Sequence, residues 1–155
     1  RVSIRTLDIG NSAHFDELKG TQETVLCLNT LEFIEDDAAA LRRAYETLGP
    51  GGNLVLLLPQ CQEYFGSLDQ AVGHLRRYSR EDISQKLAQA GFTVERMLDF
   101  NRPGVAGWLF VGKLLESGSI GKLSMKLYDH FVWLFRLVDR LLPWKGLSLI
   151  VVARK

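Results

Sequence analysis

His74 and Asp69 are the two residues of this chain whose chemistry is best suited to moving a proton. They lie in a polar segment without helical or strand periodicity, which also holds Arg76, Arg77 and Tyr78. An imidazole or a carboxylate there could remove a proton from a bound group, while an arginine could bind an anion. The alternative interpretation is that these charges are solvated at the start of the helix that follows.

A second polar junction lies in the segment TVLCLNTLEFIEDD, residues 24–37. An apolar run ends there at Asn29 and an acidic, helix-like stretch follows. We expect Asn29, Thr30 and Leu31 to line a cleft, because ligands of parallel sheets bind beyond the carboxyl ends of the strands. The alternative is that Asn29 only terminates the strand and Glu32 starts the helix.

The elements that must position these residues alternate between strands and helices. Apolar runs bounded by turn residues predict strands, and apolar residues at helical spacing predict helices. The expected strands are residues 2–7, 25–28, 53–58, 92–100 and 147–153, and the expected helices are residues 36–48 and 80–90. Ser79 predicts the N-cap of the second helix and Gly91 its end. This alternation predicts an α/β fold with a doubly wound, mostly parallel sheet.

Composition argues against several other classes of protein. The 155 residues are 46% hydrophobic and 24% charged, as in one globular domain. A formal charge of +1 gives no general attraction to nucleic acid, so no such partner is expected. Cys27 and Cys61 show neither metal-ligand nor disulfide spacing, which favours a cytoplasmic protein without a metal site. No apolar run could span a membrane, and because Arg1 rather than Met comes first we expect a fragment.

Four segments, taken together, resemble a known family. RTLDI, TVLCLNTLEFIEDD, LGPGGNLVLLLP and HLRRYSREDISQKLAQAGF resemble, in order and spacing, the second half of class I S-adenosylmethionine-dependent methyltransferases. The resemblance covers residues 2 to about 101 and the final strand. It implies a Rossmann-like methyltransferase sheet, incomplete at the N-terminal side, whose last strand runs antiparallel between the fifth and sixth. It also implies S-adenosylmethionine as the cofactor.

The resemblance assigns cofactor contacts to two strand ends. Asp8, with Ile9 beside it, matches the acidic position after the third strand that binds the adenine amino group. A carboxylate there would accept a hydrogen bond from that amine. Asn29, Thr30 and Leu31 match the segment after the fourth strand, which approaches the methionyl part of the cofactor.

The resemblance also indicates a function for the polar segment that contains Asp69 and His74. The segment CQEYFGSLDQAVGHLRRYSRED resembles the acceptor-side loop of a bacterial subgroup often found beside, or fused to, glycosyltransferases. This resemblance makes His74 and Asp69 the expected catalytic residues, with either as the base. A base is needed only where the methyl acceptor must lose a proton.

Two departures from the family pattern affect these expectations. Phe33 stands where the family usually has His in the motif LEH. The sequence also contains no G-x-G-x-G turn and no acidic residue after a second strand, the features that meet the cofactor in the family. We therefore expect the 155-residue chain to bind the cofactor weakly or not at all and to be inactive alone.

The missing front half has a structural consequence. In the family order 3-2-1-4-5-7-6, the strand at residues 2–7 would lose its neighbours. It could become disordered, pair with an exposed edge, or leave two chains to pair their open edges as a homodimer. A symmetric dimer through the strand at residues 25–28 is therefore one expectation.

The segment at about residues 102–146 is an apolar helical insert in an otherwise single partial domain. Its apolar stripe comprises Phe131, Leu134, Phe135, Val138, Leu141 and Leu142, with Arg136, Asp139 and Arg140 opposite. A stripe this wide favours core or a subunit contact over a membrane-surface contact. A lid over an apolar or lipid-linked acceptor is a further alternative.

Two functions follow from these observations. The first is S-adenosylmethionine-dependent methyl transfer to a small-molecule or glycan-type acceptor, with this chain as the carboxyl-terminal part of a larger enzyme. The second is a non-catalytic α/β module that acts through its open sheet edge or its insert in interaction or dimerisation. A Gly-rich turn encoded upstream would favour the enzyme.

Overall fold

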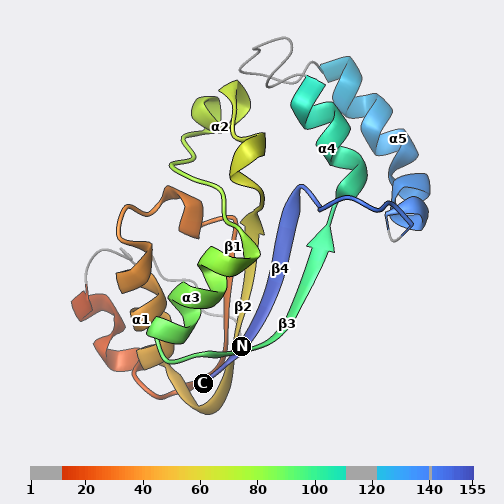
Figure 1. Ribbon diagram of the computed structural model, residues 1–155. Coiled ribbons are helices and arrows are strands. Elements are labelled where there is room, and N and C mark those ends of the chain that lie inside the picture. The colour runs from red at the N-terminus through yellow and green to blue at the C-terminus, as the bar shows by residue number, and fades with distance from the viewer. Residues whose placement is uncertain (1–11, 111–121, 140) are drawn as a thin grey trace.

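The chain forms a mixed four-stranded sheet connected by helices (Figure 1). A computed structural model describes residues 12–110, 122–139 and 141–155. The strands in these ranges are β1 (Gln22–Leu28), β2 (Leu48–Pro59), β3 (Thr93–Phe100) and β4 (Ser148–Arg154). The helices are α1 (Asp37–Thr47), α2 (Ser67–Val72), α3 (Arg80–Gln89), α4 (Arg102–Leu109) and α5 (Lys122–Val138). Short 3₁₀ helices are η1 (Ser12–Leu18), η2 (Leu31–Phe33) and η3 (Gln62–Tyr64).

The strand order of the described sheet is β1-β2-β4-β3. β1 and β2 are parallel, and β4 is antiparallel to both of its neighbours, β2 and β3. Consequently β1, β2 and β3 run in one direction and end at the same edge of the sheet. The predicted Rossmann-like sheet, with an antiparallel last strand inserted between two earlier strands, is confirmed.

β1 is the outermost strand of the described sheet, and the expected strand at residues 2–7 lies outside the described residues. One detail of the sheet differs from the sequence-based prediction. β2 begins at Leu48 rather than at residue 53. Its early start follows from the pairing of Gln22 with Leu48, which draws the glycine-rich turn into the sheet.

Local signals in the sequence fix the two helices that pack on the sheet. The Asp36 side chain caps the first turn of α1, and Ser79 caps α3 by accepting a hydrogen bond from the Asp82 amide at 3.0 Å. Gly91 ends the α3 region with a φ of +98°, where a Cβ atom would lie 3.0 Å from the Tyr45 ring. The predicted cap at Ser79 and the predicted stop at Gly91 are therefore confirmed.

The core lies between one face of the sheet and the helices α1 and α3. Alternate residues of β2 and β4 point into it, as expected for strands with one covered face. Its fully or almost fully buried members are Leu31, Ala40, Leu41, Leu48, Leu54, Leu56, Leu58, Tyr78, Ile83, Leu87, Phe92, Leu149, Val151 and Ala153. On the opposite face, Leu26, Leu28, Leu98 and Phe100 remain exposed.

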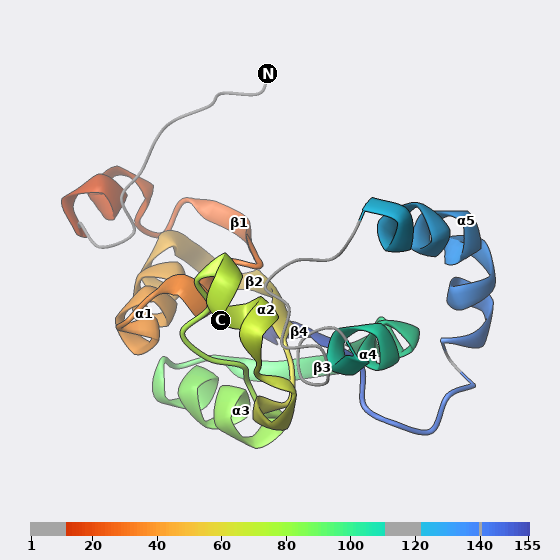
Figure 2. The same ribbon diagram turned by 90° about the horizontal axis from the view of Figure 1, so that it is seen from above.

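The insert between β3 and β4 contributes α4 and α5. Both helices lie at the end of the sheet where β3 ends, on the side away from β1 (Figure 2). The stripe on α5 is not in the core, because Phe131 and Leu141 are exposed and its other members are only half-buried. The interpretation of the stripe as core is therefore wrong.

Candidate active site

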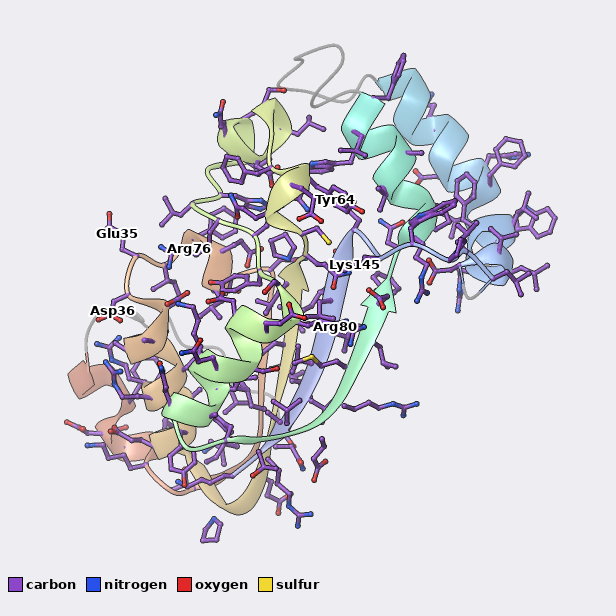
Figure 3. The ribbon with its side chains drawn as sticks, viewed as in Figure 1. Glu35, Asp36, Tyr64, Arg76, Arg80 and Lys145 are labelled. Carbon is purple, nitrogen blue, oxygen red and sulfur yellow. The ribbon has the colours of Figure 1, made fainter. Side chains whose placement is uncertain are left out.

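The residues predicted to do chemistry lie at the edge where β1, β2 and β3 end. η2 follows β1, η3 and α2 follow β2, and α4 follows β3. Figure 3 shows Glu35, Tyr64 and Arg76 at this end of the molecule. The topology therefore gathers three loops that are distant in sequence around one edge, as expected for a ligand site in an open α/β sheet.

Asn29 marks the end of β1 with a left-handed backbone. Its φ is +47°, and its amide donates to the Leu57 carbonyl at 2.9 Å, which holds the turn against β2. Asn29 and Thr30 are exposed, whereas the Leu31 side chain is buried in the core. Asn29 and Thr30 are thus the predicted cofactor-side residues that have side chains open to a ligand. Asp8 and Ile9 lie outside the described residues.

A cavity of about 300 Å³ lies beneath β1, between that strand and α1. Its lining is mostly apolar and includes Cys27, Leu31 and Leu41, with Thr30 at the margin. A ligand with charged ends needs polar partners, and this cavity offers few of them. The polar groups that could orient a substrate lie instead around His74.

Asp69 is a fully buried carboxylate with four hydrogen-bond donors. Its Oδ1 accepts from His74 Nδ1 at 2.8 Å and from Arg77 Nε at 2.9 Å. Its Oδ2 accepts from the Gly66 amide at 3.0 Å and from Trp108 Nε1 at 3.3 Å. Burial by itself would raise the pKa of Asp69, but the bonds from His74 and Arg77 outweigh it and lower that pKa below its usual value. Asp69 is therefore ionised near neutral pH.

This carboxylate determines the tautomer of His74. An ionised carboxylate can only accept hydrogen bonds, so Nδ1 of His74 must carry the hydrogen. In the neutral ring Nε2 is then the unprotonated nitrogen, the state needed by a general base. The His74 side chain remains 12% exposed, so it lies at the margin of the interior.

Glu32 lies on the other side of the His74 ring. Its Oε1 is 3.8 Å from His74 Nε2, close enough for electrostatic interaction but too far for a hydrogen bond. The residue is fully buried, and neither carboxylate oxygen has a hydrogen-bond partner in the described part of the chain. Burial raises the pKa of Glu32. His74 is thus held between two buried carboxyl groups.

Phe33 supports the same ring from outside. Its side chain packs edge-to-face on His74, with ring centroids 5.0 Å apart. An imidazole therefore lies beside position 33 even though residue 33 is not His.

The two arginines of the loop are both engaged within the protein. Arg77 is buried, donates to Asp69 and to the Gln60 carbonyl, and lies 4.8 Å from the centre of the Trp108 ring. Arg76 pairs with Asp37 at 3.0 Å and donates to the Glu35 carbonyl, toward which it points in Figure 3. These contacts support neither an anion clamp nor solvated charges.

Two residues of this cluster, Glu32 and Trp108, were not predicted from the sequence. Glu32 was considered only as the start of a helix, and because Glu is rarely fully buried, no local signal indicated its burial. Trp108 belongs to the insert, and no local signal connects it to Asp69, which lies 39 residues earlier.

Comparison with protein families matches residues 4–96 to a family described as a methyltransferase domain. Comparison with curated proteins found no match.

Solved structures with the same fold include an S-adenosylmethionine-dependent methyltransferase from Archaeoglobus fulgidus (13% identity, 97% of this chain and 66% of that one, TM-score 0.60). Another is an S-adenosylmethionine-dependent methyltransferase from Mesorhizobium loti (14% identity, 88% of this chain and 64% of that one, TM-score 0.57). The [4+2]-cyclase SpnF is also similar (18%, 88% and 50%, TM-score 0.52), so the fold alone does not define the reaction.

The chain spans 50 to 66% of the length of these three proteins. The family match covers more than half of the chain and agrees with the strand order of the sheet. The chain therefore belongs to the class I S-adenosylmethionine-dependent methyltransferase family, and S-adenosylmethionine is the cofactor of that family.

Proposed function

We propose that this chain is the carboxyl-terminal part of an enzyme that methylates a hydroxyl group of a small-molecule or glycan-type acceptor. The observation that carries the proposal is His74, whose Nδ1 is bonded to the ionised Asp69 and whose Nε2 is left as the acceptor. A hydroxyl must lose its proton when it is methylated, so an imidazole in this state has a function there.

Bound S-adenosylmethionine supplies a methyl group already activated on a sulfonium. The exposed Asn29 and Thr30 at the end of β1 fit its methionyl side. The sequence lacks the glycine-rich turn and the acidic ribose partner of the family. The described residues thus fit one side of the cofactor, and we expect weak or no binding and no activity from the 155-residue chain alone.

His74 and the two carboxyl groups beside it have different roles in the proposed proton transfer. The acceptor hydroxyl would give its proton to His74 Nε2, forming an imidazolium between Asp69 and Glu32. Two carboxyl groups in a poorly solvated environment stabilise that cation, and the bond to Asp69 keeps the ring oriented. Asp69 is therefore a positioning residue in this proposal, and Glu32 stabilises the charge that develops on His74.

The first test replaces His74 by Gln, which keeps a polar side chain but cannot hold the proton. Transfer of tritium from labelled S-adenosylmethionine to a panel of nucleotide sugars and oligosaccharides measures activity of the full-length enzyme. We expect kcat to fall by about 10²- to 10⁴-fold while affinity for S-adenosylhomocysteine stays within about twofold. His130→Gln, which changes an exposed histidine on α5, is the matched control. Wild-type kcat in His74→Gln would overturn the assignment.

The second test separates positioning from mere structure. Asp69→Asn allows Nδ1 of His74 to become the unprotonated nitrogen, which removes the acceptor from Nε2. We expect kcat to fall and the pH–rate profile to change shape, with little change in KM for S-adenosylmethionine. A profile parallel to that of the wild type would leave Asp69 with a structural role only.

The edge of β1 that pairs with no other described strand favours a second candidate function, a non-catalytic interaction or dimerisation module. Leu26 and Leu28 are 64% and 49% exposed on this outermost strand of the described sheet. Exposed apolar edges pair readily with another strand, including that of a second copy. Light scattering on the wild type and on Leu26→Lys tests this: a dimer that the variant dissociates would support the module, and a monomer would exclude the homodimer.

A further inference from the structure

The insert exposes large apolar side chains along one line of α5 and the residues after it. Trp133, Leu137 and Leu141 are 66%, 67% and 78% exposed. Trp133 and Leu137 are four residues apart and lie on one face of α5, and Leu141 follows the end of this helix. Lys126 and Arg136 on the same helix are also exposed, as is Asp129. The combination is an exposed apolar line with two cations and one anion on the same helix.

The charge of the chain is unevenly divided between the insert and the rest. Residues 102–146 hold seven of the nineteen Lys and Arg residues but only three of the eighteen Asp and Glu residues. The segment therefore carries a formal charge of +4 and the remainder −3. All three tryptophans of the chain, Trp108, Trp133 and Trp144, also lie in this segment. Tryptophan and basic residues together are typical of segments at membrane interfaces.

Polar contacts tie the two ends of the insert together. The Arg102 amide and guanidinium donate to Asp139, at 2.6 Å to Oδ1 and 2.9 Å to its carbonyl. Arg102 and Trp144 also exchange hydrogen bonds with each other's carbonyls at 2.9 and 3.0 Å. At the other end of α4, the Trp108 indole reaches Asp69. Hydrogen bonds thus join the segment that bears the exposed line to α4, and α4 to Asp69 of α2. Both α4 and α5 lie on the side of the molecule away from β1 (Figure 2).

We propose that this line, formed by Trp133, Leu137 and Leu141, docks on the surface of an anionic lipid bilayer. In this arrangement α5 lies in the plane of the interface, the three side chains enter the headgroup–acyl boundary, and Lys126 and Arg136 lie near lipid phosphates. None of the helices in the described ranges is long and apolar enough to cross a bilayer, so the contact is with the surface.

Charge decides between a bilayer and a second copy of the chain. A symmetric dimer through this face would place the same positive segment opposite itself. An anionic surface instead complements the charge of +4 and accepts the apolar side chains at the same time. One consequence rests on the proposed function: an acceptor held in the same bilayer would lie at the end of the molecule that carries His74.

The test is co-sedimentation of the protein with two kinds of vesicle, one of pure phosphatidylcholine and one containing about a third phosphatidylglycerol. We expect binding to the second kind that weakens as salt screens the phosphates. The double variant Trp133→Ser/Leu137→Ser should bind at least about tenfold more weakly, because two large apolar side chains no longer enter the lipid. Leu26→Ser, equally exposed but on β1, is the matched control and should bind as the wild type does.

Three outcomes would overturn the proposal. They are no binding to either vesicle, equal binding by the wild type and the double variant, and a concentration-dependent dimer that the double variant dissociates. Circular dichroism before and after the substitution checks that both proteins are folded, and Lys126→Glu/Arg136→Glu gives an independent test through charge alone. The measurement needs neither cofactor nor acceptor, so failure of the proposed transferase activity leaves it interpretable.

Discussion

Two buried carboxylates, Asp37 and Asp69, take hydrogen-bond donors from the same short segment, residues 74–78. The donors are Arg76 and Tyr78 for Asp37, and His74 and Arg77 for Asp69. One five-residue segment therefore joins the first turn of α1 to α2. The two clusters differ in what lies beyond these donors.

The Asp37 cluster is closed. Lys86 of α3 adds a third donor at 2.9 Å, so both carboxylate oxygens are paired. The His74 cluster is not closed, because Glu32 is buried beside the ring without a hydrogen-bond partner in the described residues. Removing a partner from a fully paired buried charge destabilises the fold, whereas a buried carboxyl group without hydrogen bonds next to a histidine calls for an explanation in function. The Asp37 cluster is therefore to be tested through stability and the His74 cluster through chemistry.

The largest expected effect is on the closed cluster. Asp37→Ala leaves Lys86, Arg76 and Tyr78 without their common acceptor, so the free energy of unfolding should fall by about 3 to 5 kcal/mol. Urea denaturation at neutral pH measures it. The neighbouring Asp36→Ala removes only the N-cap of α1 and should cost about 1 kcal/mol. Equal losses in the two variants would mean that the cluster is not a unit.

The pH dependence of the closed cluster should be that of a lowered acid. Burial would raise the pKa of Asp37, but bonds from Lys86 and Tyr78 outweigh it and lower the pKa below the ordinary 3.8. The stabilisation is therefore complete above the ordinary pKa and is lost as pH falls through the folded pKa. The difference in unfolding free energy between the wild type and Asp37→Asn should be constant near neutral pH and shrink below about pH 4, by roughly 1 to 3 kcal/mol. A difference independent of pH would contradict this.

The open cluster should respond in the opposite direction. Because burial raises the pKa of Glu32 above the ordinary 4.5, the folded state binds its proton more tightly than the unfolded chain does. Ionisation of Glu32 therefore destabilises the fold progressively as pH rises through that range. Glu32→Gln should match the wild type near pH 4 and be more stable at pH 8 by about 1 kcal/mol. A variant less stable than the wild type at pH 8 would show that ionised Glu32 has a favourable partner.

The smallest expected loss of unfolding free energy is for a substitution outside both clusters. Ser79→Ala removes the cap of α3 but leaves every donor of residues 74–78 in place, so we expect a loss of about 1 kcal/mol independent of pH. Thermal unfolding at two pH values measures it. A pH-dependent loss would show that the cap and the clusters are coupled.

The fold was largely predictable because its signals are local. Apolar runs marked β1, β2 and β4, and Ser79 and Gly91 marked the limits of α3. The start of β2 was missed because it depends on pairing with Gln22, a contact between strands that no local pattern contains.

The site was less predictable because its geometry is tertiary. His74 and Asp69 were identified by residue type, but the sequence could not show which of them is exposed. The burial of Glu32 depends on the return of the chain to η2 at Leu75, whose amide donates to the Glu32 carbonyl. The contact from Trp108 depends on the placement of the insert.

The most direct measurement is an amide NMR titration of the 155-residue chain with S-adenosylhomocysteine to millimolar concentration. We expect any saturable shifts to be weak and to lie at Asn29, Thr30 and their neighbours at the end of β1, with the amide of Asp37 unchanged. Saturable shifts confined to α3 and β3 would contradict the assignment of the cofactor to this edge of the sheet.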